Sequence, residues 1–490
     1  MSAFKHLRNY ASAGLLSALA GVLSFPVLTR NLSVEDYGLL GLVTASITVA
    51  VALGKLGLQH AIIRFFPKAA NTRDALSERQ LYSTVLTAMA VLAGVLSLLW
   101  LLGGVLLIPR VMSSGHATLL FVLGTGVVFF RLFGSAVINF LRARQSSGVV
   151  SVSQVLHKYL HLILILIALA LGQLSAAAVI GFLFIAEVVM VLYVSRALWP
   201  HVQFSAGDFS ASLLKTLIAF GLPLMAYESL SLVLRLSDRY IIEALLGVNE
   251  LGQYSASYNL SSYLELIIIS GMIQAVRPMY TTIWENESRE ATAQFLARGF
   301  YLYVVVGVPV IFGFSLLAPD LLVLLSGEKY APGTVVIPYV AFSFYLEGAV
   351  LFLGAGLHIH RDTTVFLRWA AISAVLNIAL NFIFVPLFGL VGAAFMTIVS
   401  YLVFLAGVTR VSFRSLDFPV AWRQLWLIPL LSLIAYVLLG AFDTDGLFTD
   451  LLAKGVLVSL IYAALLLALA APVRELVFAK LAQFRSGGAA

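Results

Sequence analysis

The chain has 490 residues, of which 61% are hydrophobic and only 11% are charged, and its mean hydropathy is +1.01. This composition excludes a soluble globular protein, in which charged residues make up about a quarter of the sequence. The sequence contains no cysteine, which excludes disulfides, thiolate metal sites and cysteine nucleophiles. The net charge of +7 could indicate a nucleic-acid partner, but the placement of the basic residues, described below, indicates a membrane topology instead.

The chain begins with a basic segment that contains Lys5 and Arg8, followed by an apolar stretch from Tyr10 through Leu28. The apolar region of a signal peptide is only about 7–15 residues long. We therefore expect an uncleaved first membrane helix and no signal peptide.

Apolar stretches of about 20 residues, long enough to cross a hydrocarbon core of about 30 Å, recur along the whole chain. They predict an all-α integral membrane protein with about fourteen transmembrane helices, at 10–29, 38–58, 81–108, 118–141, 149–171, 176–199, 217–246, 253–276, 300–317, 335–357, 369–387, 390–409, 424–440 and 451–471. We interpret the first twelve as two pseudo-symmetric six-helix bundles around a central polar cavity. The predicted domains are 1–212, 213–415 and, with the C-terminal helix pair, 416–490.

Three basic residues of the first half, Lys55, Arg131 and Lys158, fall inside predicted spans. Each shares a helix face with hydroxyl or amide groups. A charge that faces lipid at mid-membrane costs roughly 2.5–3.5 kcal/mol even on the most lenient scale, so these residues are expected to face a shared aqueous cavity. Together they predict a cationic wall suited to a phosphate group.

The span 217–246 carries five charges within "ESLSLVLRLSDRYIIE": Glu228, Arg235, Asp238, Arg239 and Glu243. At 100° per residue they fall within an arc of about 140°. One explanation is local pairing, of Arg235 with Asp238 and of Arg239 with Glu243. The similar stripes in other spans favour a polar face on the cavity. Arg235 and Arg239 then become further substrate-binding cations, and Glu228 and Asp238 become candidates for coupling transport to H⁺ or Na⁺.

Uncharged polar side chains follow one face of the spans 253–276 and 369–387: Tyr254, Ser257, Tyr258, Ser261, Asn377 and Asn381. Tyrosine rings can stack on sugar faces, and hydroxyl and amide groups can bond to sugar hydroxyls. These residues are therefore predicted to line a sugar path. Glu265, on the first of these spans, is a third candidate for ion coupling.

The basic residues outside the spans are distributed unevenly between the two sides of the membrane. The N-terminal tail, the even-numbered loops and the C-terminal tail hold 21 of the 30 Lys and Arg residues, and the odd-numbered loops hold three. Basic residues favour the cytoplasmic side, so both termini are predicted to be cytoplasmic.

Two pairs of segments repeat at a nearly constant offset. "LSVEDYGLLGL" at 32–42 matches "LGVNELGQYSA" at 246–256, 214 residues later, and "LSAAAVIGFLF" at 174–184 matches "LVGAAFMTIVS" at 390–400. The offset spans six predicted helices, an even number, so the two copies would have the same orientation in the membrane. Parallel repeats of this kind occur in transporters that bind substrate between two halves.

Three segments, "PVLTRNLSVEDYGLLGLVTA" from Pro26, "LGLQHAIIRFFPKA" from Leu56 and "LSDRYIIEALLGVNELGQYSASYNL" from Leu236, resemble the polysaccharide-transporter (Wzx-type) flippases of the multidrug/oligosaccharidyl-lipid/polysaccharide exporter superfamily. The resemblance covers essentially the whole chain. Residues at the family's signature positions are Arg30, Asp36, Gly38, Arg64, Asp238, Arg239 and Gly252. The resemblance makes Arg30 and Arg64 further candidates for binding the substrate. Lys55 is a departure, because many relatives carry an acidic residue there, which puts an ion-coupling role at this position in doubt.

The resemblance implies export of undecaprenyl-pyrophosphate-linked oligosaccharide units across the bacterial inner membrane by alternating access, for O-antigen, capsule or exopolysaccharide synthesis. It implies a transporter and not an enzyme, without a cofactor other than a coupling ion. The expected partners are the lipid-linked oligosaccharide and membrane lipid, together with polysaccharide polymerase and chain-length proteins, and no nucleic acid.

Three alternatives remain open. A multidrug or cation exporter of the same superfamily should have an aromatic, acidic cavity, and a lipid II flippase would share the fold. A polymerase or glycosyltransferase is disfavoured, because these enzymes usually need a sizeable extramembrane loop for their chemistry.

Overall fold

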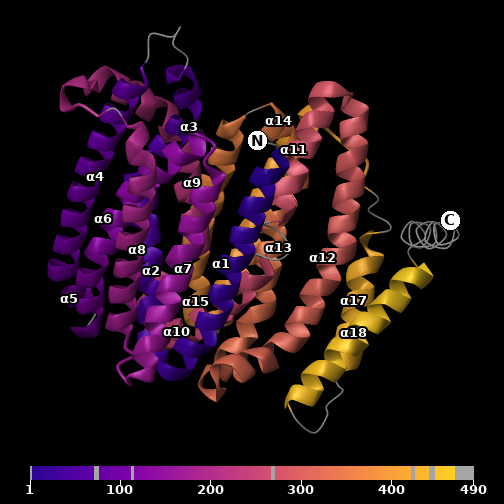
Figure 1. The fold of residues 1–490 in the computed structure, drawn as a ribbon. Coiled ribbons are helices and arrows are strands. Elements are labelled where there is room, and N and C mark those ends of the chain that lie inside the picture. The colour runs from indigo at the N-terminus through magenta and orange to yellow at the C-terminus, as the bar shows by residue number, and fades with distance from the viewer. Residues whose placement is uncertain are drawn as a thin grey trace, which may run out of the picture. The chain divides into compact units, whose positions relative to one another are not determined.

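The computed structural model describes residues 3–70, 77–111, 115–202, 204–265, 271–360, 362–420, 425–440 and 447–469 (Figure 1). Every regular element in these ranges is a helix, which confirms the all-α prediction. The α-helices are α1 (Ala3–Asn31), α2 (Val34–Gly54), α3 (Leu58–Ala69), α4 (Glu78–Leu106), α5 (Ile108–Val111), α6 (Gly115–Ala143), α7 (Ser147–Ala170), α8 (Ala176–Leu198), α9 (Ala211–Leu246), α10 (Val248–Glu265), α11 (Gly271–Asn286), α12 (Arg289–Ser326), α13 (Ile337–Leu353), α14 (Ala355–Ile359), α15 (Thr363–Ser415), α17 (Leu427–Gly440) and α18 (Leu447–Leu469).

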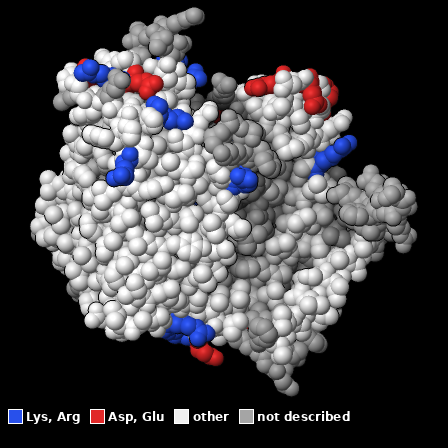
Figure 2. Space-filling model, viewed as in Figure 1, with Lys and Arg blue, Asp and Glu red and all other residues white. Residues whose placement is uncertain are grey.

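Ten helices of the described chain are long and apolar enough to cross a membrane, and α17 and part of α18 are shorter apolar helices. On the left part of the face shown in Figure 2, Lys, Arg, Asp and Glu lie toward the top and the bottom of the view, and the surface between them is a band without these residues. Such a band matches the hydrocarbon core of a bilayer. The chain is therefore a multi-pass membrane protein, while the count of fourteen spans stays a prediction.

The longest helix, α15, contains two of the predicted spans. Gly389 interrupts its helical conformation with φ 58° and ψ −139°, and the spans 369–387 and 390–409 lie on either side of this residue. Only glycine adopts such a backbone conformation readily. The break expected between these two predicted spans is thus present, at a glycine.

Contacts between helices divide the chain into two units, Met1–Ala256 with Asp362–Phe404, and Ser257–Arg361 with Leu405–Ala490. In the first unit, α6 packs against α4 and α8, α7 packs against α1 and α8, and α9 packs against α2 and α3. The domains predicted at 1–212, 213–415 and 416–490 follow the sequence duplication and not these contacts, and they stay a prediction.

The predicted span 38–58 is wrong at its end, because the chain forms two helices there. Leu56 and Gly57 have φ values of 47° and 76°, in the left-handed region, so a right-handed helix cannot continue through them. The chain restarts at Leu58 as α3, an amphipathic helix. Its buried residues are Leu58, Gln59, Ala61, Ile62, Phe66 and Ala69. The break leaves Lys55 between two helices instead of inside one.

The two copies of the repeated turn lie against each other in the first unit. A Cβ added to Gly38 would lie 2.6 Å from the Val248 carbonyl oxygen, and one added to Gly252 would lie 2.1 Å from the Val34 carbonyl oxygen. Val34 and Val248, like Gly38 and Gly252, are 214 residues apart. The contacts are therefore reciprocal, as expected around a local two-fold axis. They are possible only because neither glycine has a side chain.

The predicted span 253–276 falls partly on residues outside the described part of the chain. Its helix, α10, begins earlier, at Val248, and ends at Glu265, and the next described helix, α11, begins at Gly271. Residues 266–270 lie outside the described part of the chain.

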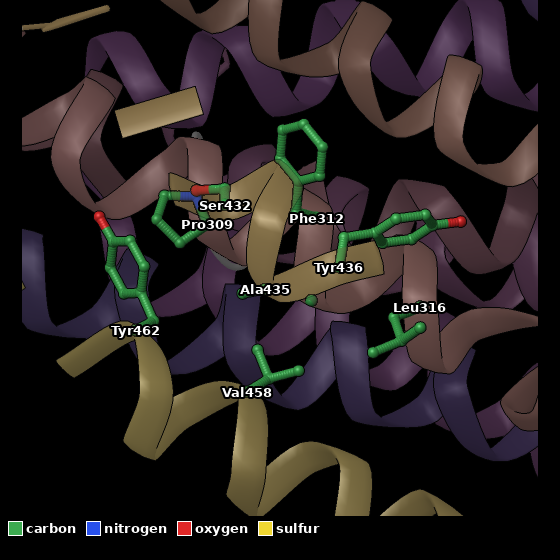
Figure 3. Close-up of a pocket in the computed structure, with 9 residues that line it drawn as sticks. Pro309, Phe312, Leu316, Ser432, Ala435, Tyr436, Val458 and Tyr462 are labelled. Carbon is green, nitrogen blue, oxygen red and sulfur yellow. The ribbon is translucent and has the colours of Figure 1, made fainter. Parts of the chain in front are cut away.

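The core of the second unit is rich in aromatic side chains. The rings of Tyr303 and Tyr345 stack with centroids 4.7 Å apart, and the Tyr303 hydroxyl donates to the Tyr345 carbonyl oxygen at 2.6 Å. The helices α17 and α18 pack against α12. The cavity that remains between them, beside Phe312 and Tyr436, measures only about 10 Å³ (Figure 3). A space of this size holds at most about one water molecule, so these helices close the unit and provide no substrate pocket there.

Candidate functional site

The predicted cations Arg131 and Lys158 lie around one buried carboxylate, Glu187 of α8. Arg131 Nε donates to Glu187 Oε1 at 2.6 Å, and His157 Nε2 lies 3.3 Å from the same oxygen. The Glu187 side chain is only 3% exposed, and an unpaired carboxylate in that position would cost several kcal/mol. The first role of Arg131 is therefore to neutralise Glu187.

Lys158 follows His157 on α7 and has a different environment. Its side chain is exposed, and it interacts electrostatically with Arg131 and Glu187. A charge that faced lipid at mid-membrane would be costly, so this exposure favours a position beside a water-accessible space.

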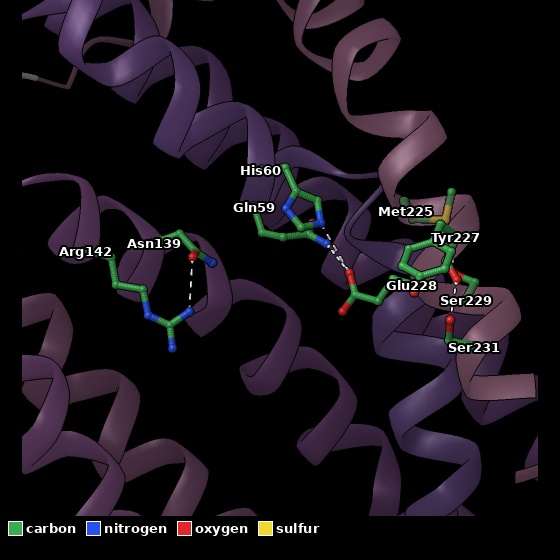
Figure 4. A network of polar contacts seen from close by, with 9 residues as sticks. All are labelled: Gln59, His60, Asn139, Arg142, Met225, Tyr227, Glu228, Ser229 and Ser231. Atoms are coloured by element: carbon green, nitrogen blue, oxygen red, sulfur yellow. Dashed lines mark hydrogen bonds and ion pairs between the residues drawn. The ribbon is translucent and has the colours of Figure 1, made fainter. Parts of the chain in front are cut away.

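A second polar group forms where α3 approaches α9 (Figure 4). Gln59 Nε2 donates to Glu228 Oε2 at 2.9 Å, and His60 Nε2 lies 3.4 Å from the same oxygen. The approach is close because Gly57 contacts Gly221 of α9, where a Cβ on Gly57 would lie 2.1 Å from the Gly221 carbonyl oxygen. The helix break thus brings a carboxamide and an imidazole to the carboxylate of Glu228.

Lys55 connects the two groups, because it interacts electrostatically with Glu228 and also with Arg131 and Arg142 of α6. Arg142 is exposed, and its Nη1 donates to Asn139 Oδ1 at 3.3 Å (Figure 4). Arg142 is absent from the predicted binding residues. The signal that could have found it is its position on the same helical stripe as Arg131 and Asn139.

Lys55 and Lys158 each lie within electrostatic range of Arg131. Their role in binding substrate stays a prediction. Arg30 lies elsewhere, because α2 separates it from Lys55 and a 21-residue helix is about 31 Å long. Arg64 is exposed on α3.

Further along α9, Asp238 and Arg239 are buried. The Tyr254 hydroxyl donates to Asp238 Oδ2, and Arg239 Nη1 donates to the Arg235 carbonyl oxygen at 3.4 Å. Asp238 is fully buried and Arg239 is 5% exposed. Asp238 lies ten residues beyond Glu228, about 15 Å along the helix, so these two acids belong to separate groups.

A buried network of uncharged polar groups connects α9 with α15. Ser237 Oγ donates to Asn377 Oδ1 at 3.0 Å, and Asn377 Nδ2 donates to Thr397 Oγ1 at 3.3 Å. Asn381 Nδ2 also donates to Asn377 Oδ1, at 3.0 Å, while Asn381 Oδ1 has no partner in the described structure. Amide, hydroxyl and carboxylate oxygens are the ligands that hard cations prefer, so this region could hold a coupling ion.

The residues predicted to line a sugar path are all buried in this conformation: Tyr254, Ser257, Tyr258, Ser261, Asn377 and Asn381. Their contact with a sugar stays a prediction. Glu265 is half-buried at the end of α10. Among the described residues, no group of three or more His, Asp or Glu side chains could hold a transition metal.

Comparison with known proteins gives a consistent result. A family model described as "Polysaccharide biosynthesis protein" matches residues 8–284. The chain is 22% identical over 421 residues to an uncharacterized membrane protein, MJ1068, of Methanocaldococcus jannaschii, a match that covers 81% of this chain and 80% of that protein. It is 22% identical over 322 residues to the succinoglycan biosynthesis transport protein ExoT of Rhizobium meliloti, covering 65% and 61% of the two chains.

Among solved structures, the lipid II flippase MurJ in an inward closed conformation has a TM-score of 0.78, with 14% identity, and the match covers 96% of this chain and 99% of that one. At this identity the likeness concerns the fold alone.

Proposed function

Because the chain belongs to the polysaccharide biosynthesis protein family, we propose that it is a flippase for lipid-linked oligosaccharides, with undecaprenyl-pyrophosphate as the lipid carrier. It is a transporter of the multidrug/oligosaccharidyl-lipid/polysaccharide exporter superfamily. The observation that carries the substrate proposal is the group of cations Lys55, Arg131, Arg142 and Lys158 within the first unit.

The cations match a pyrophosphate in number and in environment. Arg131 is neutralised by Glu187, and Lys55 lies in the field of Glu228, so Lys158 and Arg142 supply positive charge beyond that of the two carboxylates. A phosphate in a partly dry site carries a large desolvation cost, which charge-assisted bonds from Lys and Arg offset. A cationic drug would meet repulsion in the same place, which disfavours the multidrug alternative.

In this proposal the sugars follow the faces of α10 and α15, and the prenyl chain stays in the bilayer. Alternate opening of the cytoplasmic and outer sides moves the sugars across. Asp238 and the neighbouring oxygen network are the candidates for binding H⁺ or Na⁺. The protein acts in the inner membrane with both termini in the cytoplasm, beside a polysaccharide polymerase and chain-length proteins.

The second candidate is a lipid II flippase, since a probable lipid II flippase of Vibrio cholerae is 28% identical to this chain over 149 residues. The two candidates share the pyrophosphate and the carrier lipid and differ in the sugars. Cells that lack surface polysaccharide but keep normal cell walls after deletion of the gene would favour the first candidate.

The test of the cation group uses Lys55→Gln and Lys158→Gln, since neither lysine forms the ion pair that Arg131 forms. Each variant is expected to lower surface polysaccharide at least about tenfold, because a hydrogen bond to a charged group contributes about 1.5–3 kcal/mol. Lipid-linked units should accumulate on the cytoplasmic side. Polysaccharide and lipid-linked units are measured in cells that express each variant in place of the native gene.

The matched control is Lys215→Gln, which removes an exposed lysine at the start of α9. It should leave the polysaccharide unchanged. Normal polysaccharide in both Lys55→Gln and Lys158→Gln, at normal protein abundance, would contradict the proposed role of the cations.

A further inference from the structure

A groove of about 480 Å³ lies between α1 and α7, within the first unit. Sites for small molecules have volumes of about 300–1,000 Å³, so the groove is large enough for a ligand. Gly148 of α7 helps to form it, because a Cβ added there would meet no atom within 4 Å. None of the residues that line it is charged.

The polarity of the groove changes along its length. The two helices begin side by side, where Asn9 Nδ2 donates to Ser147 Oγ at 3.2 Å. Near this end the groove is lined by Asn9 and Ser12, and one to two turns further, about 10 Å along the helices, it is lined by Leu16 and Leu156. One end therefore offers hydrogen bonds, and the other offers only apolar contact.

Ser151, at the polar end, has an unused hydroxyl. A serine inside a helix normally donates to a carbonyl of the preceding turn, as Ser153 does to the Val150 carbonyl oxygen at 2.7 Å. Ser151 is only 8% exposed and its hydroxyl has no partner in the described structure. An unpaired buried hydroxyl costs free energy, which a ligand acceptor would recover.

We propose that this groove binds a bilayer phospholipid of the leaflet at the N-terminal ends of α1 and α7. The ester carbonyl groups of the lipid accept hydrogen bonds from Ser151 and from the second amide hydrogen of Asn9. One acyl chain lies along Leu16 and Leu156 toward the middle of the membrane. The lipid carrier of the flippase substrate is a poorer match, because its pyrophosphate would meet no cation in the lining and its prenyl chain has no ester carbonyl.

The test measures lipid retained by the full-length protein. The protein is reconstituted in vesicles of phosphatidylethanolamine and phosphatidylglycerol that also contain a prenyl pyrophosphate, then extracted in detergent and analysed by native mass spectrometry. The wild type should retain phospholipid. Gly148→Leu, which fills the groove, should retain at least about tenfold less, and Ser151→Ala about fivefold less, as expected for one hydrogen bond of about 1 kcal/mol.

The matched control is Gly94→Leu on α4, since a Cβ at Gly94 also meets no atom within 4 Å but lies outside the groove. It should retain as much phospholipid as the wild type. Equal retention by wild type and Gly148→Leu would overturn the proposal, and so would retention of the prenyl pyrophosphate or of detergent alone.

A photoreactive residue in place of Leu16 gives a second measurement that does not depend on the folding of Gly148→Leu. It should cross-link to phospholipid in the vesicles, and less so when Ser151→Ala is added. Cross-linking that Ser151→Ala leaves unchanged would contradict the role of the hydroxyl. Because transport is not measured, the result is independent of the proposed flippase function.

Discussion

At the scale of single residues, ion pairs hold buried charges within apolar helices. Arg131 pairs with Glu187 between α6 and α8, and Lys454 Nζ lies 2.5 Å from Asp450 Oδ2 within α18, where both side chains are buried. Removal of one member of such a pair leaves an uncompensated charge, which costs more than the loss of the attraction itself. A loss of function after a single substitution can therefore reflect lost stability.

This reasoning predicts the behaviour of Arg131. Arg131→Met should lower the free energy of unfolding by about 3 kcal/mol, because Glu187 stays buried without its main partner. The double variant Arg131→Met, Glu187→Leu should recover most of the loss. Thermal unfolding in detergent measures both, with the exposed Arg64→Met as the control that should change little. A double variant no more stable than the single one would show that the pair is not the cause.

A pH effect is predicted for His358 of α14, outside the apolar spans. Burial, together with the neighbouring Arg277 guanidinium, lowers the pKa of His358 to about 3. Below its ordinary pKa of about 6.5 the unfolded chain binds a proton that the folded chain does not bind until about pH 3, so stability falls as the pH falls through this window. The slope is at most about 1.4 kcal/mol per pH unit.

The measurement is the melting temperature in detergent between about pH 7.5 and 5. The loss toward acid pH should be smaller for His358→Gln than for the wild type. The exposed His201→Gln should behave like the wild type. Identical pH profiles for His358→Gln and the wild type would contradict the assignment.

At the scale of elements, the break between α2 and α3 depends on two backbones that touch. Gly57 has φ 76°, and a Cβ there would lie 2.1 Å from the Gly221 carbonyl oxygen. In Gly57→Ala the backbone at residue 57 should be strained, and this residue should be displaced from α9. The substitution should lower the free energy of unfolding by about 1–3 kcal/mol or more. Gly181→Ala on α8, where a Cβ meets nothing within 4 Å, should instead be neutral or stabilising.

Abundance in the membrane and the melting temperature in detergent distinguish the two alanine variants. If Gly57→Ala unfolds at the temperature of the wild type, the close contact of α3 with α9 is not needed for stability.

The helices could largely be predicted from the sequence, because the length of an apolar run determines a span. The break at Leu56 and Gly57 could not, since the apolar pattern resumes directly after Lys55 and the close contact of Gly57 with Gly221 cannot be seen in the sequence. For the site, helix faces predicted that Lys55, Arg131 and Lys158 would converge. Which of these three cations pairs with Glu187, the one acid inside the predicted spans of the first half, could not be predicted, because helix faces do not fix side-chain distances.

At the scale of the whole molecule, the uneven distribution of basic residues predicts which loops are cytoplasmic. Gln173, between α7 and α8, and Asn286, at the end of α11, are both exposed and lie on opposite predicted sides. In intact cells an impermeant thiol reagent should label Gln173→Cys and not Asn286→Cys. The cysteine-free chain gives no background of its own. Labelling of Asn286→Cys only after lysis would support the predicted topology. The reverse pattern, with Asn286→Cys labelled in intact cells and Gln173→Cys not labelled, would show that the topology is inverted.

The reciprocal contact of the repeated turns has a consequence for how the two halves can differ. Gly41 and Ser255 follow Gly38 and Gly252 by three residues and are likewise 214 residues apart. A Cβ on Gly41 would lie 2.9 Å from Ser255 Oγ. Two identical subunits meeting in this way would carry the same residue at both positions, either glycine on both sides with a void or serine on both sides with a collision. Joining the halves in one polypeptide allows a glycine to receive a serine, so each position can be selected as the complement of its counterpart.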